Sequence, residues 1–142
     1  MTPLPDWLER LDQDAFLWLH DRLHREPLHD AFRSFNELGN GFLEAVYERA
    51  LELVLKERGF HVARQQPIRV LFRGTEVGTD QADLLVNGSV LVELKAVKTL
   101  LPEHQAQVIH YLKATGLSVG LLINFGTAKI EYKRLTWNNT TN

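Results

Sequence analysis

The sequence contains no cysteine among its 142 residues. This absence excludes disulfides, thiolate metal sites and cysteine nucleophiles, and it suits a reducing cytoplasm. Long hydrophobic runs are missing as well, because no apolar stretch approaches the roughly 18–20 residues that a membrane-spanning helix requires. We therefore expect a single cytoplasmic domain with no membrane partner.

A strong charge of either sign is also missing, since the formal net charge is −2. This value argues against a dedicated, strongly basic nucleic-acid binder. The charge is uneven, however: residues 1–59 hold 7 Lys/Arg and 12 Asp/Glu, whereas residues 60–142 hold 9 Lys/Arg and 6 Asp/Glu. The acidic start has no basic n-region, so we expect no signal peptide. The mildly basic second half is compatible with a phosphate-bearing substrate.

Helical periodicity dominates the first 59 residues. It predicts an amphipathic helix over residues 5–24, a short helix over 28–37 and a longer helix over 42–58. Gly59 is expected at the C′ position, where it would end the third of these helices. The apolar stripe expected on that helix consists of Leu43, Val46, Ala50, Leu53 and Val54.

The pattern then changes to the alternation typical of strands. Three strands are expected over about residues 68–73, 76–86 and 89–97. Pro102 suits the N-terminus of a helix that Gly116 ends, so a helix is expected over 102–115. Two further strands are expected over 117–125 and 129–135, giving the order helix, three strands, helix, two strands after the N-terminal helices.

The hairpin between the second and third strands sets which side chains share a face. Asn87-Gly88 usually forms a two-residue loop, which would place Asp83 and Glu93 on opposite faces of the sheet. An odd-length loop, such as three residues with a glycine bulge, instead gathers Asp83, Glu93 and Lys95 on one face. The apolar side chains then form the other face. Burying six of them, at about 1.5–3 kcal/mol for each well-buried group, outweighs the turn preference, so the sequence predicts the odd-length loop. The six are Ala82, Leu84, Val86, Val90, Val92 and Leu94.

Two carboxylates and a lysine on one face have the chemistry of a metal-dependent phosphodiesterase. Asp83 and Glu93 are hard oxygen ligands that suit Mg²⁺, and Lys95 could orient or deprotonate an attacking water. Glu44 is a third carboxylate, in the first turn of the 42–58 helix, with Tyr47 on the same helix face.

Each of these features also has a purely structural interpretation. Glu-x-Lys on a strand commonly forms solvated ion pairs across strands. Glu44 could be a first-turn acid that the helix dipole favours. Gln107 and Tyr111, at i and i+4 on the 102–115 helix, could contact substrate, buttress Lys95 or be ordinary helix residues. Spacing alone leaves both interpretations open.

Ordered blocks of the chain resemble the bacterial family of GxxExxY proteins. Residues 41–47 match the G-x-x-E-x-x-Y signature, and residues 82–86, 92–97, 107–116 and 119–126 extend the match. That family is placed in the PD-(D/E)XK nuclease superfamily. The resemblance thus implies an α/β (α+β) fold with a restriction-endonuclease-like α-β-β-β-α-β core, a mixed sheet flanked by helices. We expect an N-terminal helical extension over residues 1–30, the nuclease-like domain over 31–136 and a disordered tail over 137–142.

The same resemblance assigns roles to individual residues. Asp83 is the core acid, Glu93 the second acid and Lys95 the motif lysine, while Glu44 matches an extra acid on the first core helix. The three acids are the expected metal ligands. Gln107 and Tyr111 match a Q-x-x-x-Y helix motif, and together with Tyr47 they are expected to bind or support the substrate. Residues 79–81 depart from the pattern, because relatives tend to show an aromatic and a basic residue there.

The function implied by the resemblance is hydrolysis of phosphodiester bonds in DNA, or with less support RNA, by a nuclease that requires Mg²⁺ or Mn²⁺. The alternative is a catalytically silent nuclease-fold module that binds nucleic acid or a protein partner, which the near-neutral charge keeps open. A third option is an interaction protein, such as a homodimer, that assembles through its N-terminal helices.

Overall fold

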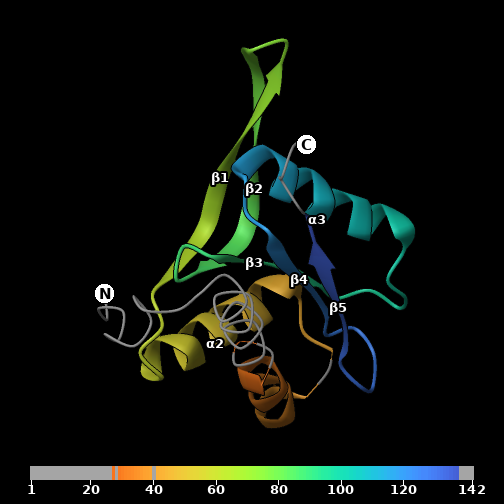
Figure 1. Ribbon diagram of the computed structural model, residues 1–142. Helices are drawn as coiled ribbons and strands as arrows, with labels where there is room; N and C mark the ends of the chain where they lie inside the picture. Colours follow the sequence, from red (N-terminus) through yellow and green to blue (C-terminus); the bar gives the residue numbers. More distant parts are fainter. Residues whose placement is uncertain (1–26, 28, 40, 138–142) are drawn as a thin grey trace.

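A mixed five-stranded sheet lies between helices in the computed structural model, which describes residues 27, 29–39 and 41–137 (Figure 1). The strand order is β1-β2-β3-β4-β5; β3 and β4 pair in parallel and the other three pairings are antiparallel. Residues 29–38 are helical. The other elements are α2 (Glu44–Glu57), β1 (Val62–Phe72), β2 (Thr75–Val86), β3 (Val90–Lys95), α3 (Pro102–Thr115), β4 (Val119–Asn124) and β5 (Glu131–Thr136).

This order confirms the predicted helix, three strands, helix and two strands. Pro102 and Gly116 bound α3 as expected, and α2 ends one residue before the predicted helix end. The predicted 5–24 helix, most of the predicted N-terminal extension and the tail residues 138–142 lie outside the described residues. In the part of the chain that the structure describes, no helix is long and apolar enough to cross a membrane.

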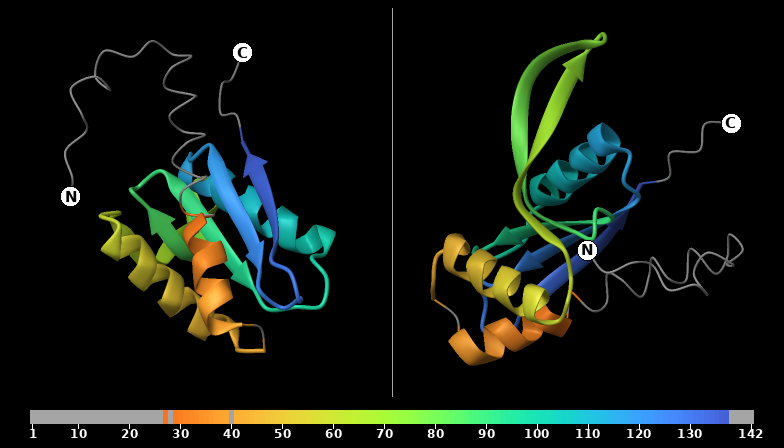
Figure 2. Two further views of the ribbon diagram at one scale, coloured as in Figure 1. Left: turned by 90° about the horizontal axis from the view of Figure 1, so that it is seen from below. Right: turned by 90° about the vertical axis from the view of Figure 1, so that its left-hand side faces the viewer.

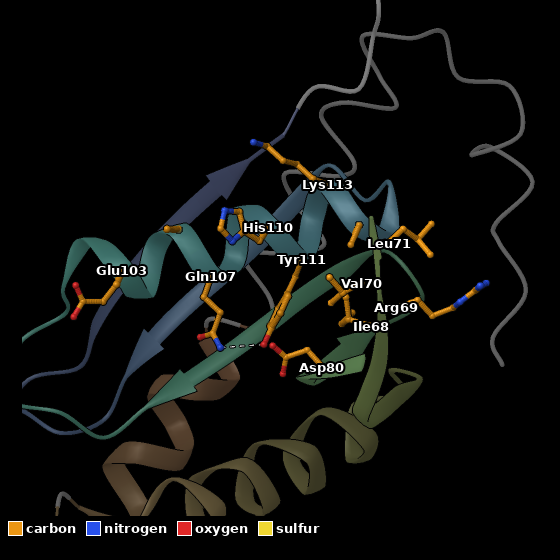
Figure 3. Close-up of a pocket in the computed structure, with 12 residues that line it drawn as sticks. Ile68, Arg69, Val70, Leu71, Asp80, Glu103, Gln107, His110, Tyr111 and Lys113 are labelled. Atoms are coloured by element: carbon orange, nitrogen blue, oxygen red, sulfur yellow. Dashed lines mark hydrogen bonds between the residues drawn. The ribbon is translucent and has the colours of Figure 1, made fainter. Parts of the chain in front are cut away.

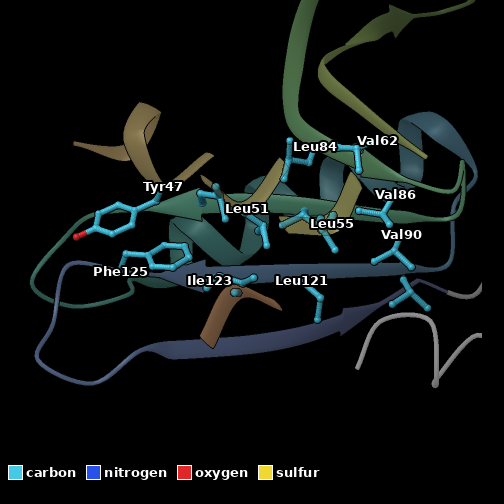
Figure 4. Packing of buried hydrophobic residues seen from close by; sticks show 14 residues of the cluster. Tyr47, Leu51, Leu55, Val62, Leu84, Val86, Val90, Leu121, Ile123 and Phe125 are labelled. Carbon is cyan, nitrogen blue, oxygen red and sulfur yellow. The ribbon is translucent and has the colours of Figure 1, made fainter. Parts of the chain in front are cut away.

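Two apolar clusters hold the layers together, one on each face of the sheet. The helix over residues 29–38 and α2 cover one face, and α3 covers the other (Figure 2). Tyr47, Leu51 and Leu55 of α2 pack on the first face against strands β2, β3 and β4 (Figure 4). On the second face, Val108 and Leu112 of α3 pack against side chains of β3 and β4. Because β4 is covered on both faces, all six of its residues are buried.

The face that α2 buries differs from the predicted stripe. Leu43, Val46 and Leu53 are exposed, and the buried side chains are Tyr47, Glu48, Leu51, Val54 and Leu55. Two overlapping stripes exist on this helix, and the observed stripe includes Tyr47, whose ring stacks on Phe125 of the adjacent loop with centroids 4.5 Å apart. Because α2 turns this stripe and not the predicted one toward the sheet, Glu48, which lies on the same helix face as Glu44, contacts the sheet.

The odd-length loop predicted between β2 and β3 is confirmed. Val86 pairs with Val90 and Leu84 pairs with Val92, which leaves Asn87, Gly88 and Ser89 in the loop. Asn87 and Gly88 both have positive φ, at 53° and 65°, a conformation that these two residue types tolerate. The apolar pattern therefore decided the register, as burial energy predicts.

The predicted apolar face is correct for five of its six members and wrong for Ala82. Leu84, Val86, Val90, Val92 and Leu94 belong to the α2-side cluster, whereas Ala82 packs on the α3 side with Ile68. The cause is an irregular backbone at Gln65, which has φ 53° and lies opposite Asp83 between the Arg64–Leu84 and Gln66–Ala82 pairs. Beyond this point β1 and β2 turn across the sheet and project as a two-stranded arm (Figure 2).

The first strand begins at Val62, six residues before its predicted start. The stretch from Arg64 to Pro67 has no apolar alternation, so the sequence did not mark it as a strand. Its backbone is paired with β2 nonetheless, and Pro67 is tolerated because β1 is an edge strand.

Candidate functional site

The carboxylates of Asp83 and Glu93 lie where β2 and β3 separate. Their strands pair only as far as Leu84 and Val92. Beyond that point side chains replace the backbone ladder: the Asp83 N–H donates to Glu93 Oε1 at 2.9 Å, and the Leu94 N–H donates to Asp83 Oδ2 at 2.7 Å. This reciprocal exchange fixes both carboxylates beside each other at the point where the sheet opens.

Lys95 follows two residues after Glu93, at the end of β3, and is half-buried. Its charge lowers the pKa values of both Glu93 and Glu44, so the ammonium group is electrostatically coupled to acids from the strand and from α2. The structure therefore brings Asp83, Glu93 and Lys95 together, as the odd-length loop between β2 and β3 predicted.

Asn124 holds the segment that follows Lys95, and the sequence interpretation missed it. Its side chain accepts from the Val97 N–H at 3.0 Å and donates to the Val97 carbonyl at 2.8 Å. Asn124 is fully buried and pairs with Lys95 in the β3–β4 register. Asn124 could have been recognised from the sequence as the single polar residue within the apolar run from Val119 to Phe125, because a buried side-chain amide needs hydrogen-bond partners.

The close approach at Gly126 gives a stability prediction. A Cβ at this residue would meet the backbone of Val97 and lie 2.7 Å from the Ala96 carbonyl carbon. Gly126→Ala is therefore expected to destabilise the protein by about 2 kcal/mol or more, measured by urea unfolding, because backbone cannot yield as a side chain can. Gly78→Ala is the matched control, since a Cβ there meets nothing within 4 Å. Equal unfolding midpoints for the two variants would contradict the tight packing.

The face of α2 that meets the sheet adds two more acids. Glu48 is buried; it accepts a hydrogen bond from the Gln65 side-chain amide and lies 3.6 Å from Arg64. The same Gln65 amide lies 3.4 Å from Asp83 Oδ1, so Gln65 bridges the two carboxylates. Glu48 and Gln65 were not predicted as site residues, because their contact depends on the helix rotation and the irregular backbone at Gln65.

Burial and the charge of Asp83 raise the pKa values of the other three acids. Burial, followed by the charge of Asp83, raises the pKa of Glu93 to about 8, and its side chain is only 3% exposed. Desolvation raises the pKa of Glu44, Lys95 lowers it in part, and Asp83 raises it further. Desolvation also raises the pKa of Glu48, with Asp83 adding to the effect. Burial is therefore the main cause of all three shifts, and the charge of Asp83 adds to each of them.

The helix α3 contributes a polar pair from the other side. Gln107 donates to the Tyr111 hydroxyl at 3.0 Å, as drawn in Figure 3. Burial is the main cause that raises the pKa of Tyr111, and the neighbouring Asp80 side chain and the charge of Glu93 add to the effect. Gln107 and Tyr111 thus lie beside the acids, as the resemblance implied. Asp80, from the stretch that departs from the family pattern, was not predicted as a site residue.

Tyr47 lies in the core and not at a solvent-facing surface. Its side chain is fully buried, and its hydroxyl donates to the Gly39 carbonyl at 2.7 Å and accepts from the Phe42 N–H at 3.3 Å. These hydrogen bonds hold the loop that precedes α2, and Glu44 is the first residue of α2. The buried hydroxyl is therefore not accessible to a substrate.

A divalent cation fits the donor set of this site. Carboxylate oxygens are hard ligands, and the charge of Asp83 adds to the larger effect of burial in raising the pKa values of Glu44 and Glu93, a repulsion that a cation would relieve. Among the described residues, however, no three His, Asp or Glu side chains approach closely enough to hold a metal ion on their own. Glu44, Asp83 and Glu93 are thus not a preassembled cage, in part because oxygens of Asp83 and Glu93 are bonded to backbone N–H groups.

Comparison with known proteins identifies the superfamily. The family model described as PD-(D/E)XK nuclease superfamily matches residues 21–135, which is most of the chain. A search of curated proteins finds no significant match.

Two solved structures align with this chain. The crystal structure of SSO0001 aligns with a TM-score of 0.50 and 20% identity over 65% of this chain and 48% of that one. An alkaline exonuclease (LHK-Exo) from Laribacter hongkongensis aligns with a TM-score of 0.49 and 16% identity, over 67% of this chain and 56% of that one. This chain therefore spans about half the length of these two structures.

Proposed function

Since this chain belongs to the PD-(D/E)XK nuclease superfamily, whose nucleases typically use divalent metal ions, we propose that it hydrolyses phosphodiester bonds of DNA with Mg²⁺ or Mn²⁺. The observation that carries the proposal is the reciprocal pairing of Asp83 and Glu93 at the opening of the sheet, with Lys95 beside them. An ordinary surface Glu-x-Lys ion pair would not bury Glu93 to 3% exposure.

In this proposal the residues divide the work. Asp83 and Glu93 would hold the metal, and Glu44 would supply a further carboxylate. The bound ion would polarise the phosphoryl group and lower the pKa of a water. Lys95 orients that water or offsets charge on the scissile phosphate. Gln107 and Tyr111 position the substrate strand, and Asn124 positions the backbone after Lys95.

Metal binding is the direct test of this assignment. Isothermal titration with Mn²⁺ is expected to give saturable binding to the wild-type protein and no binding to Asp83→Ala, because this change removes a ligand and frees the Leu94 N–H. Glu37→Ala, which removes an exposed acid of the first described helix, is the control and is expected to bind as the wild type does. Unchanged affinity in Asp83→Ala would remove the metal assignment.

Cleavage assays then separate a nuclease from a silent binding module. Single-stranded, duplex and branched DNA and an RNA strand are incubated with Mg²⁺, with Mn²⁺ or with EDTA. We expect cleavage of DNA in either metal and none in EDTA. Binding of all substrates with no cleavage of any would favour the silent module.

Four finer assignments belong to the same proposal. Within the superfamily, the signature at residues 41–47 favours the GxxExxY subdivision. The domain boundaries at residues 30 and 136, the cytoplasmic location and homodimerisation are proposed on the sequence patterns alone.

A further inference from the structure

The projecting arm of β1 and β2 is unusual in its exposed apolar tip. The β-arm comprises residues 67–80, and Figure 2 shows it extending beyond the sheet. Leu71, Phe72 and Val77 are 56%, 60% and 61% exposed. Natural sheets normally protect such projecting edges with charge or cover, so an exposed apolar tip indicates a partner.

The tip also has a cation on an aromatic face and a defined shape. The Arg73 guanidinium lies 5.1 Å from the centre of the Phe72 ring. Arg73 and Gly74 both have positive φ, at 52° and 78°, between the paired residues Phe72 and Thr75. This is the tight hairpin turn that matches strand twist, so the tip is preorganised. An exposed ring with an adjacent arginine is the kind of surface on which unpaired bases stack.

A groove joins the β-arm to the proposed catalytic site. It has a volume of about 730 Å³ and runs between the arm and α3, and Gln107, Tyr111 and Asp80 line it (Figure 3). Its apolar lining includes Ile68 and Val70. Tyr111, which lies near the charge of Glu93, therefore also lines the groove, so the two sites are neighbours.

Charge in the groove is arranged along its length. Glu103 and Asp80 lie toward the end that holds Gln107 (Figure 3). Arg69 lies on the β-arm, and Lys113 lies in the last turn of α3 with its ammonium group 4.6 Å from the centre of the Trp137 ring. Arg69 is also 3.5 Å from Glu76, but this pair is solvent-exposed, so a phosphate could replace the glutamate with little loss. These two cations suit a phosphate backbone that leads away from the acids.

We propose that the β-arm and this groove bind an unpaired DNA strand, with bases against Phe72 and the apolar lining and phosphates near Lys113 and Arg69. A single strand is favoured because the groove has a volume of about 730 Å³, which is that of a small-molecule site, and because stacking on Phe72 requires a base that is not paired in a duplex. The role of this strand as substrate rests on the proposed nuclease function; its binding does not.

Fluorescence anisotropy of a labelled thymidine oligonucleotide in EDTA tests the binding. Phe72→Ala is expected to weaken binding by about 5- to 100-fold, the range of one base–aromatic stack. Lys113→Gln is expected to weaken it by about 5-fold near 0.1 M salt, the loss of one phosphate contact. Leu53→Ala, which removes an equally exposed side chain from α2 (60%), and Lys133→Gln on β5 are the matched controls and are expected to bind as the wild type does. Thermal melting checks that every variant is folded.

The outcomes separate this inference from the proposed function. Hydrolysis of bis(4-nitrophenyl) phosphate with Mn²⁺, a diester too small to reach the arm, is expected to survive Phe72→Ala and to be lost in Lys95→Ala. If no variant hydrolyses this diester but Phe72→Ala still loses the oligonucleotide, the nuclease proposal fails and the strand site stands. Wild-type affinity in both Phe72→Ala and Lys113→Gln would overturn the strand site. The strand site would also be overturned if these variants lost affinity for duplex DNA as much as for the single strand. A variant whose molar mass by light scattering differs from that of the wild type while its oligonucleotide affinity is unchanged would indicate a protein interface instead.

Discussion

Glu93→Gln is expected to make the metal-free protein more stable while abolishing nuclease activity. The glutamine keeps an oxygen that can accept from the Asp83 N–H, but it removes a charge from a side chain that is 3% exposed. In EDTA at pH 8 the gain in unfolding free energy is expected to be about 1–3 kcal/mol, measured by urea unfolding. The same change removes a proposed metal ligand, so cleavage of DNA should fall below detection.

The gain should depend on pH in a defined direction. The pKa of Glu93 is about 8 in the folded protein and near 4.5 without burial. Between these values the folded state holds a proton that the unfolded chain releases, so the wild-type protein loses stability as pH rises from about 4.5 to 8. Glu93→Gln lacks this proton, and its advantage should therefore grow across that window and level off above it.

Metal addition provides the second half of this test. Mn²⁺ binds the folded state, so it should raise the melting temperature of the wild-type protein and leave that of Glu93→Gln unchanged. Glu37→Gln, which neutralises an exposed acid outside the site, should match the wild type in both conditions. If Glu93→Gln is less stable than the wild type at every pH, the buried carboxylate stabilises the folded protein, and the prediction is wrong.

Lys95→Ala is expected to reduce the rate of DNA cleavage by about 10²- to 10⁴-fold, the usual contribution of one positioned acid–base or electrostatic group. Oligonucleotide binding in EDTA should change little, because the proposed role of Lys95 lies in the chemical step. Single-turnover kinetics with saturating enzyme measure this step directly. Since Lys95 lowers the pKa values of Glu44 and Glu93, the variant should also need a higher pH for any residual activity.

Two further variants identify what Lys95 contributes. Lys98→Ala, at an exposed position three residues later, is the control for charge in this segment and should cleave at the wild-type rate. Lys95→Arg keeps the charge but cannot release a proton, so partial recovery would indicate electrostatic stabilisation and no recovery would indicate proton transfer. Equal rates for Lys95→Ala and the wild type would refute the catalytic assignment of Lys95.

Features with local causes could be predicted from the sequence. Pro102 and Gly116 begin and end α3 through their own backbone preferences, and Gly59 closes α2 in the same way. The register of the β2–β3 hairpin was also predictable, because a shift of one residue would have exposed the apolar side chains of both strands. That register placed Asp83, Glu93 and Lys95 on one face.

Features that depend on two or more elements could not be predicted in this way. Helix α2 carries two overlapping apolar stripes, and the stacking of Tyr47 on Phe125 selects between them. The irregular backbone at Gln65 turns Ala82 toward α3 and brings the Gln65 amide between Glu48 and Asp83. None of these contacts leaves a periodic mark in the chain.

The sequence by itself determined the order of the elements, the register of the central hairpin and the identity of its three charged residues, because each follows from local backbone preference or from burial of an alternating pattern. Only the tertiary structure decided which further groups join them. Glu48, Asp80 and Asn124 reach the site from a helix, the arm and a neighbouring strand. Such convergence is set by how rotated and twisted layers pack, and that packing depends on contacts between residues far apart in the chain.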